Sequence, residues 1–179
     1  MIRKQLLPLL FAITTVIGFN SCQKIRDLKT FDIDYSTSFE IPSSSIFGGL
    51  VQTPPQQIET NTSSSLEDQG TKTKWVKTIY LNNMKGTITN PSNEDFNFLE
   101  RIEVYVNADG VDEVLMAYNY NVPEDVNTIS LTPTDCDLKA FLLKDAIQIR
   151  TVATASNSRA VTVKADLSFE VEAQLKLFK

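Results

Sequence analysis

Carboxylates spaced along one stretch are the residues of this sequence best suited to chemistry. Asp32, Asp34 and Glu40 alternate with apolar residues, so they should share one face of a strand. Glycoside hydrolysis uses two carboxyl groups about 5 to 9.5 Å apart. The side chains of residues two apart on a strand are separated by a distance near the lower limit of this range. A water-facing strand shows the same pattern without any chemistry, and this simpler interpretation is preferred.

A second acidic cluster surrounds Gly110. Asp109, Asp112 and Glu113 carry the oxygen atoms that a calcium ion prefers. The spacing lacks the further acids and the distal glutamate of an EF-hand loop, so a hydrated turn between two strands is the preferred interpretation. The sequence therefore predicts no metal site and no cofactor.

Four aromatic side chains are candidates for stacking on sugar rings. Tyr105 has the parity of its polar neighbours and is expected to be exposed. Tyr118 and Tyr120 share the parity of the apolar residues before them, so core packing is preferred for both. The fourth candidate is Trp75, which is the only tryptophan of the chain.

The sequence contains no histidine. This excludes Ser-His-Asp and Cys-His nucleophilic systems and every zinc site that needs an imidazole. The sequence also lacks a glycine-rich phosphate loop, a G-x-S-x-G elbow and a dinucleotide-binding motif. These absences favour a protein that is not an enzyme, although chemistry that uses only carboxylates survives them.

The N-terminal stretch that ends at Cys22 has the features of an export signal. Two cations, Arg3 and Lys4, precede an apolar run from Leu6 to Ile17, and a short polar segment follows. A membrane-spanning helix needs about 20 apolar residues, so this run is too short to be one. The small residues of an ordinary A-x-A cleavage site are missing.

This stretch resembles a lipobox, the motif cut by the bacterial lipoprotein signal peptidase. Ser21 suits the position before the cysteine, whereas Phe19 and Asn20 differ from the usual leucine and small residue. The resemblance covers only the first 22 residues, and it implies that Cys22 becomes the first mature residue and is acylated. The alternative is a plain secretion signal that happens to end at a cysteine.

The residues after Cys22 bear on the destination. Lipoproteins of this kind are retained at the inner membrane when Asp follows the cysteine, so Gln23 implies the outer membrane. Residues 23–26 also lack the acidic cluster that directs some lipoproteins to the outer surface, which favours the periplasmic face. A disulfide to the only other cysteine, Cys136, would leave no acyl anchor, and Cys136 is expected to be a small buried residue of a helix.

The charge of the chain excludes one class of partner. Removal of residues 1–21 takes away two cations and no acid, so fifteen cations face twenty-two acids and the formal charge moves from −5 to −7. An acidic domain repels nucleic acid, and no block of Lys and Arg is present. No nucleic-acid partner is therefore expected.

Apolar residues alternate with polar ones through most of the chain, which predicts strands. A bulge near Asn82-Asn83 should change the inward face of one strand, because the apolar parity shifts there. Residues 107–110 have turn chemistry and should join two strands as a hairpin. Seven or eight strands are expected in all, with the clearest at 31–41, 75–89, 102–106, 114–120, 129–131, 147–153 and 161–177.

Helical signals are few. A helix is expected over 134–145, with Thr134 or Asp135 as its cap, and a shorter one over 94–100 after Asn93. Between residues 42 and 74, Pro54-Pro55 interrupts any regular element. A second edge strand near Ile58 and a turn or single helical turn at 66–70 are the expectations there.

The predicted fold class is all-β and mostly antiparallel. A sheet with one dry face needs a cover, and too little helix is present to supply it, so two packed sheets are expected. The predicted organisation is a signal peptide at 1–21, a tether at 22–29 and a single β-sandwich domain at 30–179 with one or two short helices and an irregular stretch at 42–74.

Two function classes remain open. The preferred one is a lipid-anchored cell-envelope protein, not an enzyme, that binds or scaffolds a protein or glycan partner. The alternative is a glycan-binding protein or a carboxylate-dependent glycan hydrolase. Apart from the membrane that holds the anchor, the sequence names no partner.

Overall fold

A computed structural model describes residues 28–41, 46–47, 49–157 and 159–175. Cys22, the predicted signal and most of the predicted tether lie outside the described residues. No helix within the described ranges is long and apolar enough to cross a membrane. The elements in chain order are β1 (Leu28–Ile41), β2 (Ile46–Phe47), β3 (Leu50–Gln52), β4 (Gln56–Glu59), α1 (Thr62–Asp68), a 3-10 helix (Thr73–Trp75), β5 (Val76–Asn90), β6 (Leu99–Ala108), β7 (Val111–Asn119), β8 (Thr128–Pro133), α2 (Lys139–Leu142), β9 (Ala146–Ala155) and β10 (Val161–Gln174).

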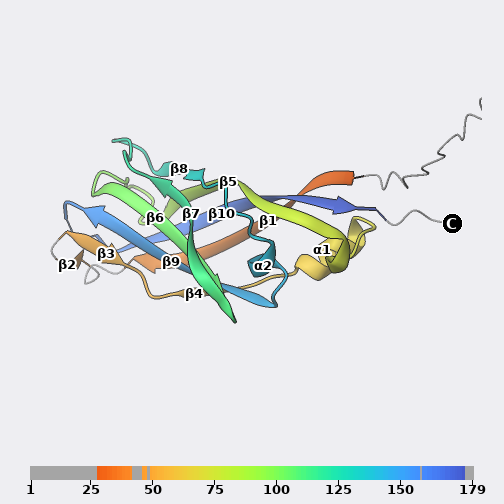
Figure 1. Ribbon diagram of the computed structural model, residues 1–179. Coiled ribbons are helices and arrows are strands. Elements are labelled where there is room, and N and C mark those ends of the chain that lie inside the picture. The colour runs from red at the N-terminus through yellow and green to blue at the C-terminus, as the bar shows by residue number, and fades with distance from the viewer. Residues whose placement is uncertain (1–27, 42–45, 48, 158, 176–179) are drawn as a thin grey trace, which may run out of the picture.

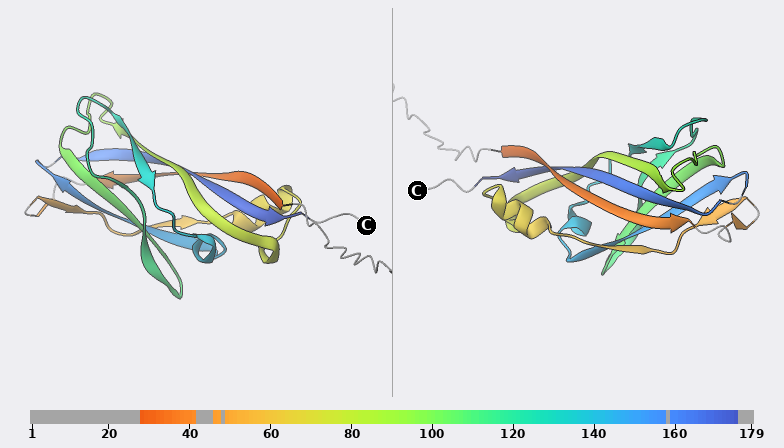
Figure 2. Two further views of the ribbon diagram at one scale, coloured as in Figure 1. Left: turned by 45° about the horizontal axis from the view of Figure 1, so that its top comes forward. Right: turned by 180° about the vertical axis from the view of Figure 1, so that it is seen from behind.

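The strands form two layers of one curled antiparallel sheet (Figures 1 and 2). The first layer runs β1-β10-β5-β8, and the second runs β7-β6-β9-β3-β2, with β4 also paired to β9. β8 joins the layers, because it pairs with β5 on one side and with the end of β7 on the other. The predicted all-β, antiparallel sandwich with short helices is confirmed.

β10 holds the first layer together, since it pairs with β1 along its whole length and with β5 along most of it. Its odd-numbered residues from Val161 to Ala173 are all buried, as a strand at the centre of a layer requires. On β5 the register shifts by one residue at Asn82, so that Leu81 and Met84 both face the core. The bulge predicted at this point is confirmed.

β6 and β7 form the predicted hairpin. Ala108 pairs with Val111, which leaves a two-residue turn of Asp109 and Gly110. Gly110 has a φ of 70°, in the left-handed region that a glycine enters without steric cost. The sequence signal and the backbone geometry therefore agree at this turn.

The long helix expected over 134–145 is wrong. Only Lys139–Leu142 is helical, because the residues before it are bound to neighbouring strands. The backbone N–H of Leu138 donates to the carbonyl of Ile79 at 2.7 Å, and the Asp137 carboxylate accepts from the Ile79 N–H at 3.0 Å. Thr134 donates to the carbonyl of Leu115 on β7 at 2.8 Å and caps no helix.

The helix expected over 94–100 is also wrong, since this segment is a loop that leads into β6. The Asn97 amide donates to Asp95 and Asp125 at 3.0 Å each, and Phe96 is buried in the core. Hydrogen bonds to a distant loop thus replace the i to i−4 bonds of a helix.

In the stretch 42–74, the edge strand expected near Ile58 is confirmed as β4. A helix of seven residues, α1, lies where a turn or single helical turn was expected at 66–70, and it begins four residues earlier. Leu66 of α1 is fully buried, so the helix closes one end of the space between the layers. β1 begins at Leu28 and takes in the last two residues of the predicted tether.

The core has room for one more methyl group at Gly86 of β5. A Cβ built there would lie 3.5 Å from Val163 Cγ1 and 3.7 Å from Ile129 Cγ1, which is ordinary van der Waals contact. The same residues line a small apolar cavity of about 30 Å³ between the layers. An alanine at this position therefore meets no obstacle.

We expect Gly86→Ala to stabilise the domain by about 0.4 to 1 kcal/mol, because it restricts the unfolded chain and fits the native backbone. The matched control is Gly110→Ala, which places a Cβ at a φ of 70° and should destabilise by about 1 to 2 kcal/mol. Thermal unfolding of both variants measures the two effects. A lower midpoint for Gly86→Ala would contradict this account of the cavity.

Candidate functional site

Three tyrosines gather on the solvent-facing side of the β6–β7 hairpin because of a bulge in β7. Val104 pairs with Ala117 and Tyr105 pairs with Leu115, so Met116 has no partner and the parity of β7 changes there. Tyr118 consequently lies opposite Glu103, on the outer side. The sequence-based expectation that Tyr118 and Tyr120 pack in the core is wrong, and the side chain of Tyr120 is 53% exposed.

Arginines lie over the rings of two of these tyrosines. The rings of Tyr118 and Tyr120 are stacked with centroids 4.5 Å apart, and Arg101 Cζ lies 5.1 Å from the Tyr120 centroid. Arg150 Cζ, from the neighbouring strand β9, lies 4.6 Å from the Tyr105 centroid. These are cation–π contacts, and they restrain the relative positions of the rings and guanidinium groups.

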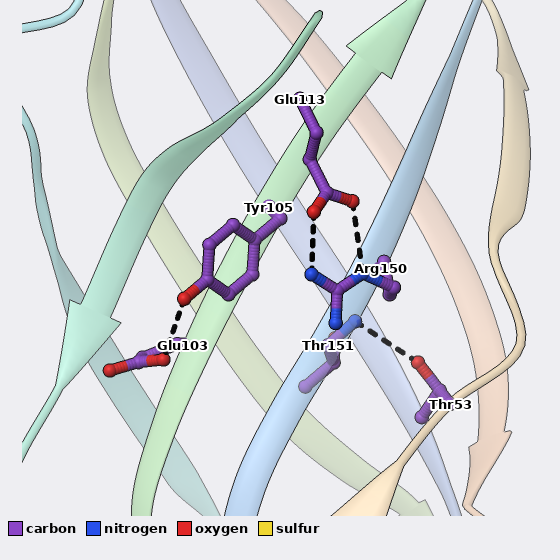
Figure 3. Close-up of polar contacts among 6 residues, drawn as sticks. All are labelled: Thr53, Glu103, Tyr105, Glu113, Arg150 and Thr151. Carbon is purple, nitrogen blue, oxygen red and sulfur yellow. Dashed lines mark hydrogen bonds and ion pairs between the residues drawn. The ribbon is translucent and has the colours of Figure 1, made fainter.

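Two glutamates complete the arrangement (Figure 3). Glu103 accepts a hydrogen bond from the Tyr105 hydroxyl at 2.8 Å and one from Arg101 at 2.7 Å. Glu113 accepts two from Arg150, at 2.9 and 2.5 Å, in a bidentate pair. The name tyrosine face is used below for the set Arg101, Glu103, Tyr105, Glu113, Tyr118, Tyr120 and Arg150.

Hydrogen bonds to neighbours set the protonation states of this face. The Tyr105 hydroxyl, and Arg101 after it, lower the pKa of Glu103, while the same bond raises the pKa of Tyr105. Arg150 lowers the pKa of Glu113. Both carboxyl groups are therefore ionised at neutral pH, whereas the general acid of a glycosidase needs a raised pKa.

A further contact holds β9 at the edge that faces away from β6. Thr53, just after β3, exchanges two hydrogen bonds of 3.2 Å with the backbone of Thr151, and both residues are buried (Figure 3). The neighbouring residue, Arg150, thus projects from a strand that is hydrogen-bonded along both edges, to β6 and to the segment after β3. This fixes the position of the guanidinium relative to Tyr105.

The other candidate residues do not join this face. Asp32, Asp34 and Glu40 are exposed on β1, in the other layer, as expected for a water-facing strand. Trp75 lies in the 3-10 helix before β5, with Lys74 Nζ 5.5 Å from its ring centroid. The four aromatic candidates therefore split into a group of three and one separate ring.

The calcium-loop hypothesis gains no support from the geometry of the β6–β7 turn. Glu113 is committed to Arg150, and the described residues contain no group of three acids, cysteines or histidines arranged to hold a metal ion. Asp109 and Asp112 remain at the hairpin turn, as the preferred interpretation had it.

Cys136 differs from its expected role as a buried helical residue. It is half-exposed and precedes α2, although it packs against the edge of the core. Burial, and the nearby Asp137 charge, raise the pKa of the Cys136 thiol. The side chain is therefore a thiol at neutral pH, which makes it a poor nucleophile.

Sequence reasoning missed Arg101 and Arg150 as members of the site. They are 49 positions apart in the sequence and no local motif marks either of them. The only available signal was their parity, because each shares the outward parity of the polar residues on its own strand. Their meeting depends on the pairing of β6 with β9, in which Tyr105 lies opposite Arg150.

Comparisons with known proteins add little. No family model and no curated protein matches the chain. Among solved structures, the decameric BFDV capsid protein matches with a TM-score of 0.44 at 9% identity, over 83% of this chain and 99% of that one. The 60-mer of the BFDV capsid protein matches with a TM-score of 0.42 at 10% identity, over 86% of this chain and 97% of that one. Similarity at this level carries no argument about function.

We expect Glu113→Gln to cost about 0.5 to 1 kcal/mol of stability at pH 7, since the paired group is partly exposed. The folded-state pKa of Glu113 is lowered, so its contribution is present above the unfolded value near 4.3 and is lost as pH falls through the folded value. Denaturant unfolding at pH 7 and pH 3 measures the difference, which should be smaller at pH 3. Glu124→Gln, at an exposed loop residue, should have no effect at either pH, and a cost for Glu113→Gln that is undiminished at pH 3 would contradict the ion-pair account.

Proposed function

We propose that this chain is a lipid-anchored binding module of the cell envelope, not an enzyme, and that it binds a partner protein through the tyrosine face. The observation that carries the proposal is the gathering of Tyr105, Tyr118 and Tyr120 with two arginines on one solvent-facing side of the hairpin. Tyrosine and arginine, together with tryptophan, are the residue types enriched at the energetic centres of protein interfaces.

The contacts within the face lower the cost of binding. Each immobilised side chain costs about 0.5 to 1.5 kcal/mol on association when it is free beforehand. Here Arg150 is held by Glu113 and stacked on Tyr105, and Arg101 is held by Glu103 and stacked on Tyr120. Much of this ordering is therefore complete before a partner arrives.

The same contacts favour a protein partner over a sugar. Stacking on a pyranose requires a free ring face. Tyr120 has Tyr118 against it and Arg101 over it, and one face of Tyr105 is covered by Arg150. A sugar would have to displace these guanidinium groups, whereas a protein partner contacts the exposed edges and the outer surface of the cluster as it stands.

The anchor follows from the sequence. Cys22 acylated at the outer membrane would hold the domain close to the bilayer, because the six residues from Cys22 to the start of β1 span at most ~20 Å. Several acyl chains make such an anchor stable. The tyrosine face, on the second layer, would then be accessible to partners in the periplasm. The anchor would contribute only by holding the domain at the membrane.

The alternative is a glycan-binding protein or a hydrolase that uses Asp32 and Asp34. The exposure of both carboxylates on an open strand face favours hydration over catalysis, since nothing there excludes water. Incubation of the purified protein with a polysaccharide panel tests this alternative. Cleavage that is lost in Asp32→Asn or Asp34→Asn would replace the present proposal.

The anchor gives a prediction for native material. Intact-mass spectrometry of protein extracted from the envelope should show a chain that begins at Cys22 and carries acyl groups. Cys22→Ala should release the protein from the membrane fraction. A mature chain that starts elsewhere, or that has a free thiol at Cys22, would refute the anchor while leaving the tyrosine face untested.

The face gives a second prediction. A photo-crosslinking amino acid at Tyr120 should capture one protein of defined mass in intact cells, and the same group at Tyr80, exposed on β5 of the other layer, should not. After identification and purification of that protein, Tyr120→Ala should weaken its affinity at least tenfold. Equal crosslinking at both positions, or unchanged affinity, would exclude this face as the binding surface.

A further inference from the structure

We propose that the free edge of β1 binds an extended strand of a partner protein, with apolar residues at alternate positions and Lys or Arg between them. This site is separate from the tyrosine face, because β1 lies in the first layer and the hairpin in the second. Addition of a strand to a sheet edge gains affinity from main-chain hydrogen bonds and specificity from alternate side chains.

The edge is long and regular. β1 pairs with β10 at all fourteen positions from Leu28 to Ile41 without a register shift. Within the described ranges, no strand pairs with its other edge. It therefore presents a continuous row of backbone N–H and C=O groups to a further strand.

β1 lacks most of the usual devices that prevent such pairing. Prolines, lysines, inward-pointing charges, bulges and short length protect natural sheet edges. β1 has one such residue, Lys29 at its start, which donates to Gln69 at 2.8 Å, whereas residues 30–41 contain no proline, glycine or lysine. The opposite end of the sheet is protected by contrast. β2 and β3 have two and three residues, and Pro54-Pro55 separates β3 from β4.

The inward side chains of β1 are only partly covered. Phe31, Tyr35 and Phe39 face the core but are half-buried. On the neighbouring strand the inward residues Phe169 and Val171 are at most 1% exposed. The difference arises because β1 has a neighbour on one side only. An added strand would bury the remaining apolar surface, and this burial favours binding.

Charge decides the chemistry of the partner strand. On the outer side of β1, Asp32 lies directly opposite Glu170 of β10, a like-charge pair that destabilises a sheet. None of the ion pairs in the described part of the chain includes Asp32, Asp34, Glu40 or Glu170. Lysine or arginine on an added strand would pair with these carboxylates and relieve the repulsion.

A second copy of β1 fits the edge poorly. Full overlap of two antiparallel copies of β1 would place inward residues opposite outward ones, because Leu28 would pair with Ile41. Two registers shifted by one residue keep inward residues opposite inward residues. One of them places Asp34 directly opposite Asp34 of the other copy. The other places Asp34 diagonal to its counterpart and Asp32 diagonal to Glu40. The seam of a homodimer would thus add like charges, so a basic strand from another protein is the better occupant.

The test uses the mature chain purified from the envelope in a nonionic detergent, with capped fluorescent ten-residue peptides as probes. We expect a peptide of alternating valine and lysine to bind and to protect the β1 amides from hydrogen exchange. Alternating valine and glutamate, or valines and lysines in separate blocks, should not bind. Asp32→Asn with Asp34→Asn should weaken binding about three- to tenfold, and the substitutions remove a repulsion, so the fold should remain intact.

The decisive control is the valine–lysine peptide with N-methyl groups at alternate backbone nitrogens. N-methylation removes main-chain donors and leaves the charge unchanged. If this peptide binds as well as its parent, the attraction is electrostatic only and the proposal fails. Protection that appears at β6–β7 instead of β1, or protection of β1 through self-association without peptide, would also overturn it.

Discussion

The two-residue period of the strands is the constraint on which the rest of the structure depends. Each strand buries one parity and exposes the other, so a single unpaired residue moves every later side chain to the opposite side. The chain uses such a shift at Asn82 of β5 and again at Met116 of β7. The first keeps the core continuous, and the second brings Tyr118 and Tyr120 out to meet Tyr105.

The two shifts also show how far sequence reasoning reaches. At Asn82 the apolar residues on both sides have opposite parity, so the bulge could be predicted from the pattern. At Met116 the next residue is Ala117, and both are buried. Nothing in the sequence distinguishes a bulge there from a continuous strand, because tyrosine suits either face. The fold class could be predicted from the alternation of apolar and polar residues. The residues on the outward face of the hairpin could not, because they depend on whether Met116 pairs with the neighbouring strand.

The helix predictions were wrong for a related reason. Leu138, Phe141 and Leu142 have helical spacing, but the residues before them bind the edges of β5 and β7 through Asp137, Leu138 and Thr134. Hydrogen bonds to strands distant in sequence outweigh a weak local preference, as is usual for short helices. In the same way Arg101 and Arg150 joined the candidate site through strand pairing. Structure that depends on residues close in the sequence could be predicted, and contacts that depend on the pairing of distant strands could not.

The two proposed surfaces differ in whether their charged groups already have partners of opposite sign, and this difference predicts what kind of partner each surface would bind. On the tyrosine face each arginine is already paired with a glutamate. A partner would therefore meet a preformed surface on which new ion pairs contribute little to binding. Along β1, Asp32 lies opposite Glu170, and no ion pair among the described residues includes either carboxylate, so a partner strand gains from supplying a cation. Because β1 begins at Leu28 and includes the last two residues of the predicted tether, an acyl anchor would keep the start of this edge near the bilayer. The C-terminal half of β1, around Phe39 and Glu40, would lie farther from that anchor than its start.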